Sequence, residues 1–132
     1  MPSDANIVLA ASATVTATTN GTAFILAGGT PRRGLVARVI YSGALNTSAS
    51  DTIQFGIGVC YDGVPTTWNL DFLAPIITLT TTAQSGEIFI PFSISPTSVA
   101  NGTQIRLTAT FSASSTHGNT ITYQGDIVPG RP

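Results

Sequence analysis

The stretch "DTIQFGIGV", from Asp51 to Val59, decides the fold class of this chain. Successive side chains of a β-strand point to opposite faces, so a period of two gathers alternate residues on one face. One face here is apolar throughout and carries Ile53, Phe55, Ile57 and Val59. The other face carries small or polar residues, namely Gln54, Gly56, Gly58 and then Cys60. We predict a half-buried strand with its apolar face in the core, and outward glycines that leave a flat surface open to another backbone.

Other stretches along the chain alternate in the same way. They are "SATVTAT" (12–18), "GEIFIPF" (86–92), "TQIRLTATFSA" (103–113) and "NTITYQG" (119–125). Further candidate strands are "ANIVLAA" (5–11), "TAFILA" (22–27), "GLVARVIYS" (34–42), "TWNLDFL" (67–73) and "IITLTTT" (76–82). Turn-forming Gly, Asn and Pro separate them, and no segment has helical periodicity. The pattern predicts an all-β chain, an antiparallel β-sandwich of about eight to ten strands with either a jelly-roll or an immunoglobulin-like arrangement.

Length and cysteine content indicate how the chain folds. Its 132 residues have the length of one domain, which we place at 1–132, and a domain of this size buries roughly 65–70% of its unfolded surface. The lone Cys60 cannot form an internal disulfide, so we expect folding in a reducing cytoplasm. For the thiol itself we favour a buried, inert group, because no cationic neighbour in the sequence would activate it. An exposed thiol is the alternative.

Charge is the most unusual property of the composition. Charged residues make up 8% of the chain and the formal net charge is −1, whereas an ordinary soluble domain is about 25% charged. The surface must therefore consist of Thr, Ser, Asn, Gln and Gly with apolar residues between them. Such a surface is suited to lying against other protein. The alternative is that Thr-rich strands are soluble enough without charges.

Residues that could carry catalysis or bind a metal are few and scattered. His117 is the only histidine, and its loop contains no carboxylate. The six acids stand singly, mostly at predicted strand ends or turns where an Asp caps its own backbone and stays solvated; they are Asp4, Asp51, Asp62, Asp71, Glu87 and Asp126. We therefore expect no catalytic residues, no metal site and no cofactor.

Nucleic acid and membrane are not expected partners either. The five basic residues, all arginine, face six acids, and the pI is near 5.5, whereas direct binding to phosphates needs several cations acting together. No apolar run approaches the length of about 20 residues that a membrane span needs. The N-terminal apolar stretch has no basic residue before it, which makes it a poor signal peptide.

One stretch, "CYDGVPTTWNLDF" (60–72), is compatible with sugar binding. Lectin-like sandwiches set an exposed aromatic ring beside a few fixed polar groups. The candidate glycan contacts are Tyr61, Asp62, Trp68 and Asn69. The interpretation that we favour is structural: Trp68 packs over the edge of the core, as large aromatic side chains of β-domains usually do.

Four phrases of the sequence together resemble a known class of virion proteins. They are "GTPRRGLVARV" (29–39), "ITLTTTAQSGEIFIPF" (77–92), "RLTATFS" (106–112) and "ITYQGDIVPGRP" (121–132). The chain resembles the capsid decoration, or cement, proteins of tailed double-stranded DNA bacteriophages. The resemblance implies a non-enzymatic β-sandwich, made in the host cytoplasm, that docks on the outer surface of the assembled shell and clamps neighbouring subunits of the major capsid protein. A tail or head-fibre protein that recognises a host glycan is the alternative within the virion, and a stand-alone carbohydrate-binding module is the alternative outside it.

Two segments are candidates for such docking. Arg32 and Arg33 enter a predicted strand and Arg38 follows within it, so all three could pair with carboxylates of a capsid subunit or a sister subunit. Equally, these charges could keep a strand end soluble and discourage edge pairing. Residues 1–12 form the second candidate, an extended docking segment in which Ile7, Val8 and Leu9 add to a neighbour's sheet edge. Self-association, as a trimer or a dimer, would present several such faces at once.

Overall fold

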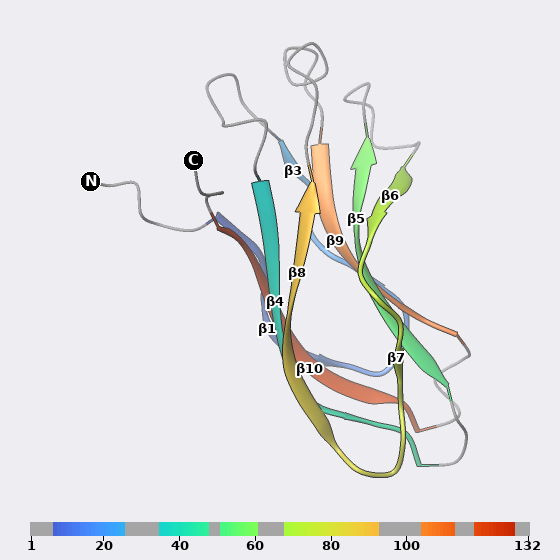
Figure 1. The fold of residues 1–132 in the computed structure, drawn as a ribbon. Helices are drawn as coiled ribbons and strands as arrows, with labels where there is room; N and C mark the ends of the chain where they lie inside the picture. Colours follow the sequence, from blue (N-terminus) through green and yellow to red (C-terminus); the bar gives the residue numbers. More distant parts are fainter. Residues whose placement is uncertain are drawn as a thin grey trace.

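The computed structural model describes residues 7–25, 35–47, 51–60, 68–92, 104–112 and 118–128. These residues form ten strands in two curved layers (Figure 1). In chain order the strands are β1 (Ile7–Val15), β2 (Thr19–Asn20), β3 (Phe24–Ile25), β4 (Leu35–Leu45), β5 (Thr52–Cys60), β6 (Asn69–Leu73), β7 (Ile77–Thr78), β8 (Gln84–Phe92), β9 (Gln104–Phe111) and β10 (Thr120–Val128). No helix occurs in these ranges, which confirms the prediction of an all-β chain. None of the described residues therefore offers a helix that could span a membrane.

The strand order identifies the type of sandwich. A four-stranded sheet has the order β1-β10-β4-β8, and a six-stranded sheet has the order β2-β9-β5-β6, with β3 on β9 and β7 on β5. All of these pairs are antiparallel. The pairs nest: β1 with β10, β2 and β3 with β9, β4 with β8, and β5 with β6 and β7. A long hairpin rolled on itself in this way is a jelly roll, so the order decides between the two arrangements that the sequence left open.

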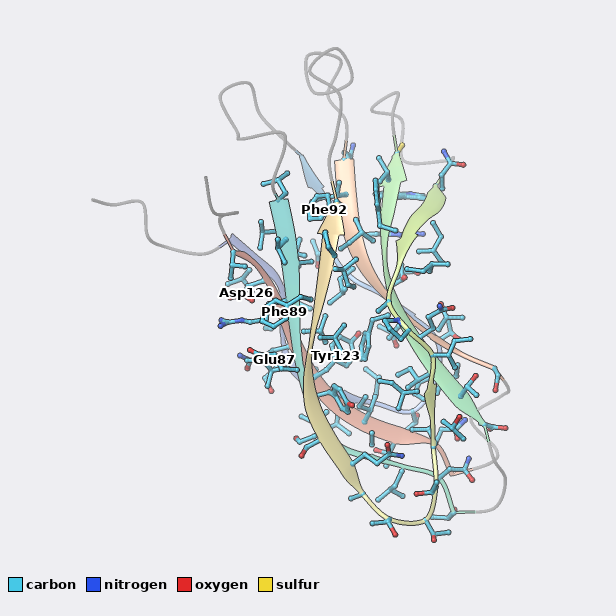
Figure 2. All side chains as sticks on the ribbon, in the orientation of Figure 1. Glu87, Phe89, Phe92, Tyr123 and Asp126 are labelled. Atoms are coloured by element: carbon cyan, nitrogen blue, oxygen red, sulfur yellow. The ribbon has the colours of Figure 1, made fainter. Side chains whose placement is uncertain are left out.

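The core lies between the two sheets. Ile53, Phe55, Ile57 and Val59 of β5 are all fully buried, which confirms the inward face predicted for this strand. Tyr123 of β10 meets the ring of Phe55 edge-on from the other sheet, at 5.0 Å between ring centroids. In Figure 2, Tyr123 and Phe92 point into the space between the sheets, whereas Glu87 and Phe89 point away from it. The burial pattern of the strands thus follows the period of two in the sequence.

The N-terminal strand differs from the sequence prediction. Two candidate strands, residues 5–11 and 12–18, were expected there, but the structure has the single strand β1. Its pairing with β10 shifts register between Val8 and Ala10 and again between Ala10 and Ala13. Each register shift inserts an extra residue into β1, so the strand stays continuous although the alternation of its inward and outward side chains is interrupted.

A buried polar cluster closes one end of the sandwich. Asn119, just before β10, accepts a hydrogen bond from the side-chain amide of Asn46, and its own Nδ2 donates to Asp51 Oδ2 at 2.9 Å. All three residues are buried. The expectation that Asp51 stays solvated at a strand end is therefore wrong. Its carboxylate instead holds the segment before β10 against the start of β5, since a buried carboxylate must be satisfied by donors.

Candidate interaction surfaces

The first candidate surface lies on the outer face of the six-stranded sheet. Gly56 and Gly58 face outward on β5, as predicted, but the flat surface that they leave is covered by side chains of the same chain. A Cβ atom at Gly56 would lie 2.8 Å from Leu73 Cδ2 and 3.0 Å from Leu70 Cδ1. A Cβ at Gly58 would lie 3.6 Å from Trp68. The glycines therefore seat apolar side chains from the segment that leads into and forms β6.

Trp68 and Arg106 form the centre of this surface. Arg106 of β9 is paired with Gly58 in the neighbouring strand β5, and its guanidinium carbon lies 4.1 Å from the centre of the Trp68 ring. A cation over the face of an indole ring is attracted by the electron-rich π-system. Both side chains pack beside Gly58: Trp68 Cε3 would lie 3.6 Å and Arg106 Cγ 3.7 Å from a Cβ placed there, which are ordinary van der Waals contacts.

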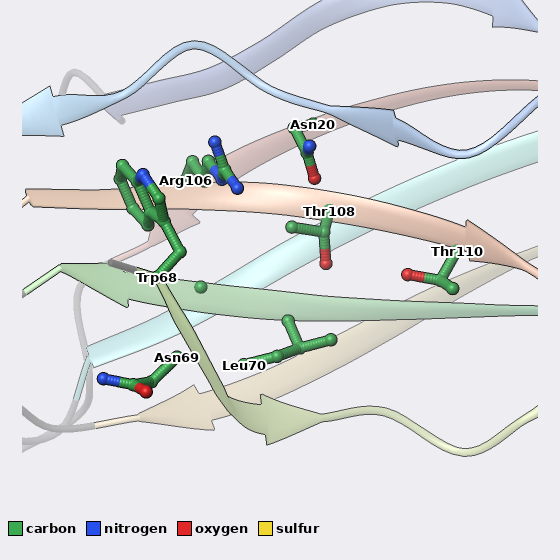
Figure 3. Close-up of a pocket in the computed structure, with 8 residues that line it drawn as sticks. Asn20, Trp68, Asn69, Leu70, Arg106, Thr108 and Thr110 are labelled. Atoms are coloured by element: carbon green, nitrogen blue, oxygen red, sulfur yellow. The ribbon is translucent and has the colours of Figure 1, made fainter. Parts of the chain in front are cut away.

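A groove of about 120 Å³ runs along this stack (Figure 3). We call it the indole groove and define it by Asn20, Trp68, Asn69, Arg106, Thr108 and Thr110. Its polar groups come from β2, β6 and β9, and Leu70 adds an apolar side chain. Thr108 Oγ1 donates to the carbonyl oxygen of Gly56 at 3.2 Å, which fixes the hydroxyl and leaves its oxygen able to accept a further hydrogen bond. The groove thus combines one aromatic ring, one cation, amides and hydroxyls.

Arg106 differs from an ordinary surface arginine. Its Nε atom is buried and has no hydrogen-bond partner. Within the described ranges no carboxylate forms an ion pair with Arg106, and the ion pairs found there all belong to Arg38. A buried donor without an acceptor costs about 1–3 kcal/mol, so this guanidinium has hydrogen-bonding capacity that the described part of the chain does not use.

The second candidate surface is the outer face of the four-stranded sheet. Val8, Asp126, Arg38 and Phe89 are cross-strand neighbours in one row over β1, β10, β4 and β8. Ile40 and Glu87 are paired in the next row. We call these residues together the Phe89 face. Its apolar side chains are well exposed, with 65% of the surface of Val8, 53% of Phe89 and 38% of Ile40 open to solvent.

Charges at the centre of the Phe89 face are paired with each other. Arg38 donates from Nε to Asp126 Oδ1 at 3.3 Å and from Nη2 to Asp126 Oδ2 at 3.0 Å. Glu87 Oε2 lies 4.0 Å from Arg38 Nε. The hydrogen bonds and charge of Asp126 raise the pKa of Arg38 above its usual value, so the guanidinium stays charged at every pH at which proteins are handled. The pair is a fixed polar feature surrounded by exposed apolar groups.

The predicted docking residues have different positions. Ile7 begins β1 and is paired with Ile127. Leu9 is only 3% exposed and belongs to the core of its own sandwich, so we withdraw it as a docking candidate. Val8 and Arg38 are part of the Phe89 face, whereas Arg32 and Arg33 lie outside the described residues. Residues 7–12 of the expected docking segment are thus part of this chain's own sheet.

Of the four predicted glycan contacts, two lie at the indole groove and two lie outside the described residues. Trp68 lies on the outer face of the six-stranded sheet beside Gly58, so the favoured expectation that it packs over the edge of the core is wrong. Asn69 is exposed and lines the same groove. Tyr61 and Asp62 lie outside the described residues. Sequence reasoning missed Arg106 because only the strand register places it beside Trp68.

The remaining chemically active side chains form no second site. Cys60 is fully buried, as favoured from the sequence, and His117 lies outside the described residues. Among the residues that the structure describes, no three His, Cys, Asp or Glu side chains gather around a point where a metal ion could bind. Comparison of the chain with protein-family models, with curated proteins and with solved structures finds no match.

Proposed function

We propose that this chain is a non-enzymatic structural protein of a tailed bacteriophage virion: a capsid decoration protein that binds the outer surface of the shell and bridges neighbouring subunits of the major capsid protein. The observation that carries the proposal is the Phe89 face, where exposed apolar side chains surround a single paired cluster of charges. The low charge of the whole chain supports it, because charged residues are depleted at the cores of protein interfaces.

The Phe89 face has the composition of an interface core. Phe89 is a large aromatic side chain, more than half exposed, on the edge strand β8, and aromatic and arginine side chains supply most of the binding energy at protein interfaces. Arg38 is held by Asp126 before any partner arrives. A side chain that is already ordered loses less conformational entropy on binding. The face is thus suited to dock against protein with little rearrangement.

The architecture adds support by analogy. Jelly rolls occur in viral capsid proteins and in lectins, and fold analogy alone does not decide function. What favours a shell partner is the extent of the surface: the row from Val8 to Phe89 crosses all four strands of the sheet. Bridging two capsid subunits requires a broad face of this kind rather than a small pocket.

Cosedimentation with capsids tests the proposal. Purified protein is mixed with capsids of the same phage from which it has been removed, and binding is measured across concentrations. We expect saturation at a fixed ratio to the major capsid protein and greater resistance of the shell to heat. Absence of binding to these capsids would overturn the capsid role.

A matched pair of variants tests which face docks. Phe89→Ala should weaken capsid binding about tenfold or more, since truncating a central aromatic anchor typically costs more than about 1.4 kcal/mol. Leu73→Ala is the control, because Leu73 is 51% exposed, close to the 53% of Phe89, but lies on the other sheet. Thermal unfolding verifies that both variants are folded. If Leu73→Ala weakened binding and Phe89→Ala did not, docking by the Phe89 face would be refuted.

A further inference from the structure

The two described arginines on the outer sheet faces are in opposite situations. Arg38 on the four-stranded sheet is paired with two carboxylates. Arg106 on the six-stranded sheet is stacked on Trp68, has a buried Nε without an acceptor, and forms no ion pair within the described ranges. A guanidinium is matched in shape and charge by a carboxylate, and Arg106 has no such partner within the described ranges, so an anionic group that enters the groove has an unpaired guanidinium to meet.

The surroundings of Arg106 indicate what else the ligand carries. Trp68 and Leu70 provide apolar surface beside the guanidinium, which suits the C–H face of a sugar ring. Asn20, Asn69 and Thr110 are exposed and carry amide and hydroxyl groups along the same groove. Amides and hydroxyls both donate and accept hydrogen bonds, as sugar hydroxyls require. An apolar ligand would leave these groups unpaired.

From these observations we propose that the indole groove binds a carboxylate-bearing sugar, such as a hexuronic acid residue of a glycan. The carboxylate pairs with Arg106, the ring lies against Leu70 and the part of Trp68 that borders the groove beside the stacked guanidinium, and the hydroxyls bond to the amides and hydroxyls around it. This assignment gives a ligand class to the carbohydrate-binding interpretation of the sequence, and it does not depend on the capsid role. A nucleic acid does not fit, because the described residues of the groove supply a single cation and polyphosphates need several.

The dimensions of the groove set the expected affinity. Its volume of about 120 Å³ is well below the roughly 300–1,000 Å³ of sites that enclose a drug-sized ligand. It is suited to one sugar ring and leaves the rest of a chain in solvent. We therefore expect a monosaccharide to bind with a dissociation constant of about 1 mM, and repeated contacts of several protein copies to raise the affinity for a polysaccharide.

Fluorescence titration tests the inference directly, because Trp68 is the only tryptophan of the chain. The probes are methyl glucuronide and methyl glucoside, which share a ring and differ in the carboxylate. We expect the glucuronide to change the emission of Trp68 saturably and the neutral glucoside to bind about tenfold more weakly. Saturation-transfer NMR on the same solutions provides an independent measure of binding.

Variants test whether Arg106 recognises the carboxylate of the sugar. Arg106→Gln should lower the affinity for glucuronide about tenfold and bring the two sugars to within about twofold of each other. Arg106→Lys keeps the charge and should restore part of the preference. Gln124→Ala, an exposed residue of the opposite sheet, should bind as the unchanged protein does, and thermal unfolding verifies that each variant is folded.

Three results would overturn the assignment. Absence of any change in the fluorescence and in the NMR signal with either sugar would remove the site. Equal binding of glucuronide and glucoside would remove the role of the carboxylate. Equal binding of acetate or of a short acidic peptide would show a carboxylate site that does not recognise sugar. None of these results depends on capsid binding, so failure here and failure of the capsid role remain distinguishable.

Discussion

Gly125 of β10 shows how closely the two sheets approach at one residue. It faces the core, and a Cβ atom there would lie 2.5 Å from Leu107 Cδ2 of the opposite sheet. Leu107 is itself fully buried, so it has little room to withdraw. The glycine is therefore required by packing rather than by backbone conformation.

We predict that Gly125→Ala lowers the free energy of unfolding by about 1–3 kcal/mol, because it adds a methyl group to a filled core. Urea denaturation measures the change. Gly58→Ala is the matched control: its Cβ would make ordinary contacts, the nearest at 3.6 Å, and an alanine at an unstrained position stabilises by about 0.4–1 kcal/mol. Equal stability of the two variants would contradict this account of Gly125.

Tyr123 makes stability depend on pH at the alkaline end. Burial raises the pKa of its phenol above the usual value, which is about 10. The folded protein therefore keeps this proton to a higher pH than the unfolded chain does. The resulting stability is fully present below pH of about 10 and is lost as the pH rises above it.

We predict that Tyr123→Phe reduces this alkaline loss of stability, while near pH 7 the variant stays within about 1 kcal/mol of the unchanged protein. Thermal unfolding followed by circular dichroism between pH 8 and about 11 measures both quantities. If the melting temperatures of the two proteins fell in parallel with pH, Tyr123 would not be the group responsible.

At the residue scale, the sequence predicts inward and outward positions well and contacts poorly. The inward face of β5 follows from its period of two. The stack of Arg106 on Trp68 does not, because it depends on the pairing of Gly58 with Arg106 across two strands that lie far apart in the chain. Likewise, nothing local distinguishes the buried Asp51 from a solvated one.

The strands differ in the local stability that their position in the sheets predicts. β5 lies between β9 on one side and β6 and β7 on the other, and its residues from Phe55 to Cys60 are buried on both faces. β1 is an edge strand with two register shifts, and its side chains from Ala11 to Thr14 are all exposed. Stability is therefore expected to be highest at β5 and lowest at β1.

Native-state hydrogen exchange checks this difference. We predict that the amides of β1 near its irregular pairing exchange at least about tenfold faster than those of β5 and β9, because local opening of an edge strand exposes them without global unfolding. Mass spectrometry of peptides from the two regions provides the rates. Uniform protection across both sheets would mean that β1 opens only with the whole molecule.

At the element scale, sequence patterns locate strands better than they delimit them. Most predicted strands appear at the expected positions, but two N-terminal candidates merge into β1 and the candidate at 76–82 shortens to β7 (Ile77–Thr78). Strand ends depend on which partner is alongside, and β7 is paired with β5 only at Thr52 and Ile53. Such partners come from distant parts of the chain and leave no local signal.

At the scale of the whole molecule, the two candidate surfaces lie on opposite sides of the sandwich. The Phe89 face and the indole groove lie on the outer faces of the two sheets, with the core between them. A molecule docked through the Phe89 face would turn the indole groove away from the shell. The sequence predicts a sandwich, but its jelly-roll order, and hence this opposition of surfaces, requires the long-range pairings.

The place of β10 within its sheet affects the order in which the strands can pair. β10 is the last strand of the described chain, yet it lies inside its sheet, between β1 and β4. A ribosome delivers it after the others, and until then β1 lacks its partner and β4 has an open edge. Pairing over such a separation is slow, and the chain has few charges to keep open edges apart. Pairing of β10 with β1 and β4 is thus a late step in the folding of this sheet, and until it occurs both open edges are exposed to pairing with other chains.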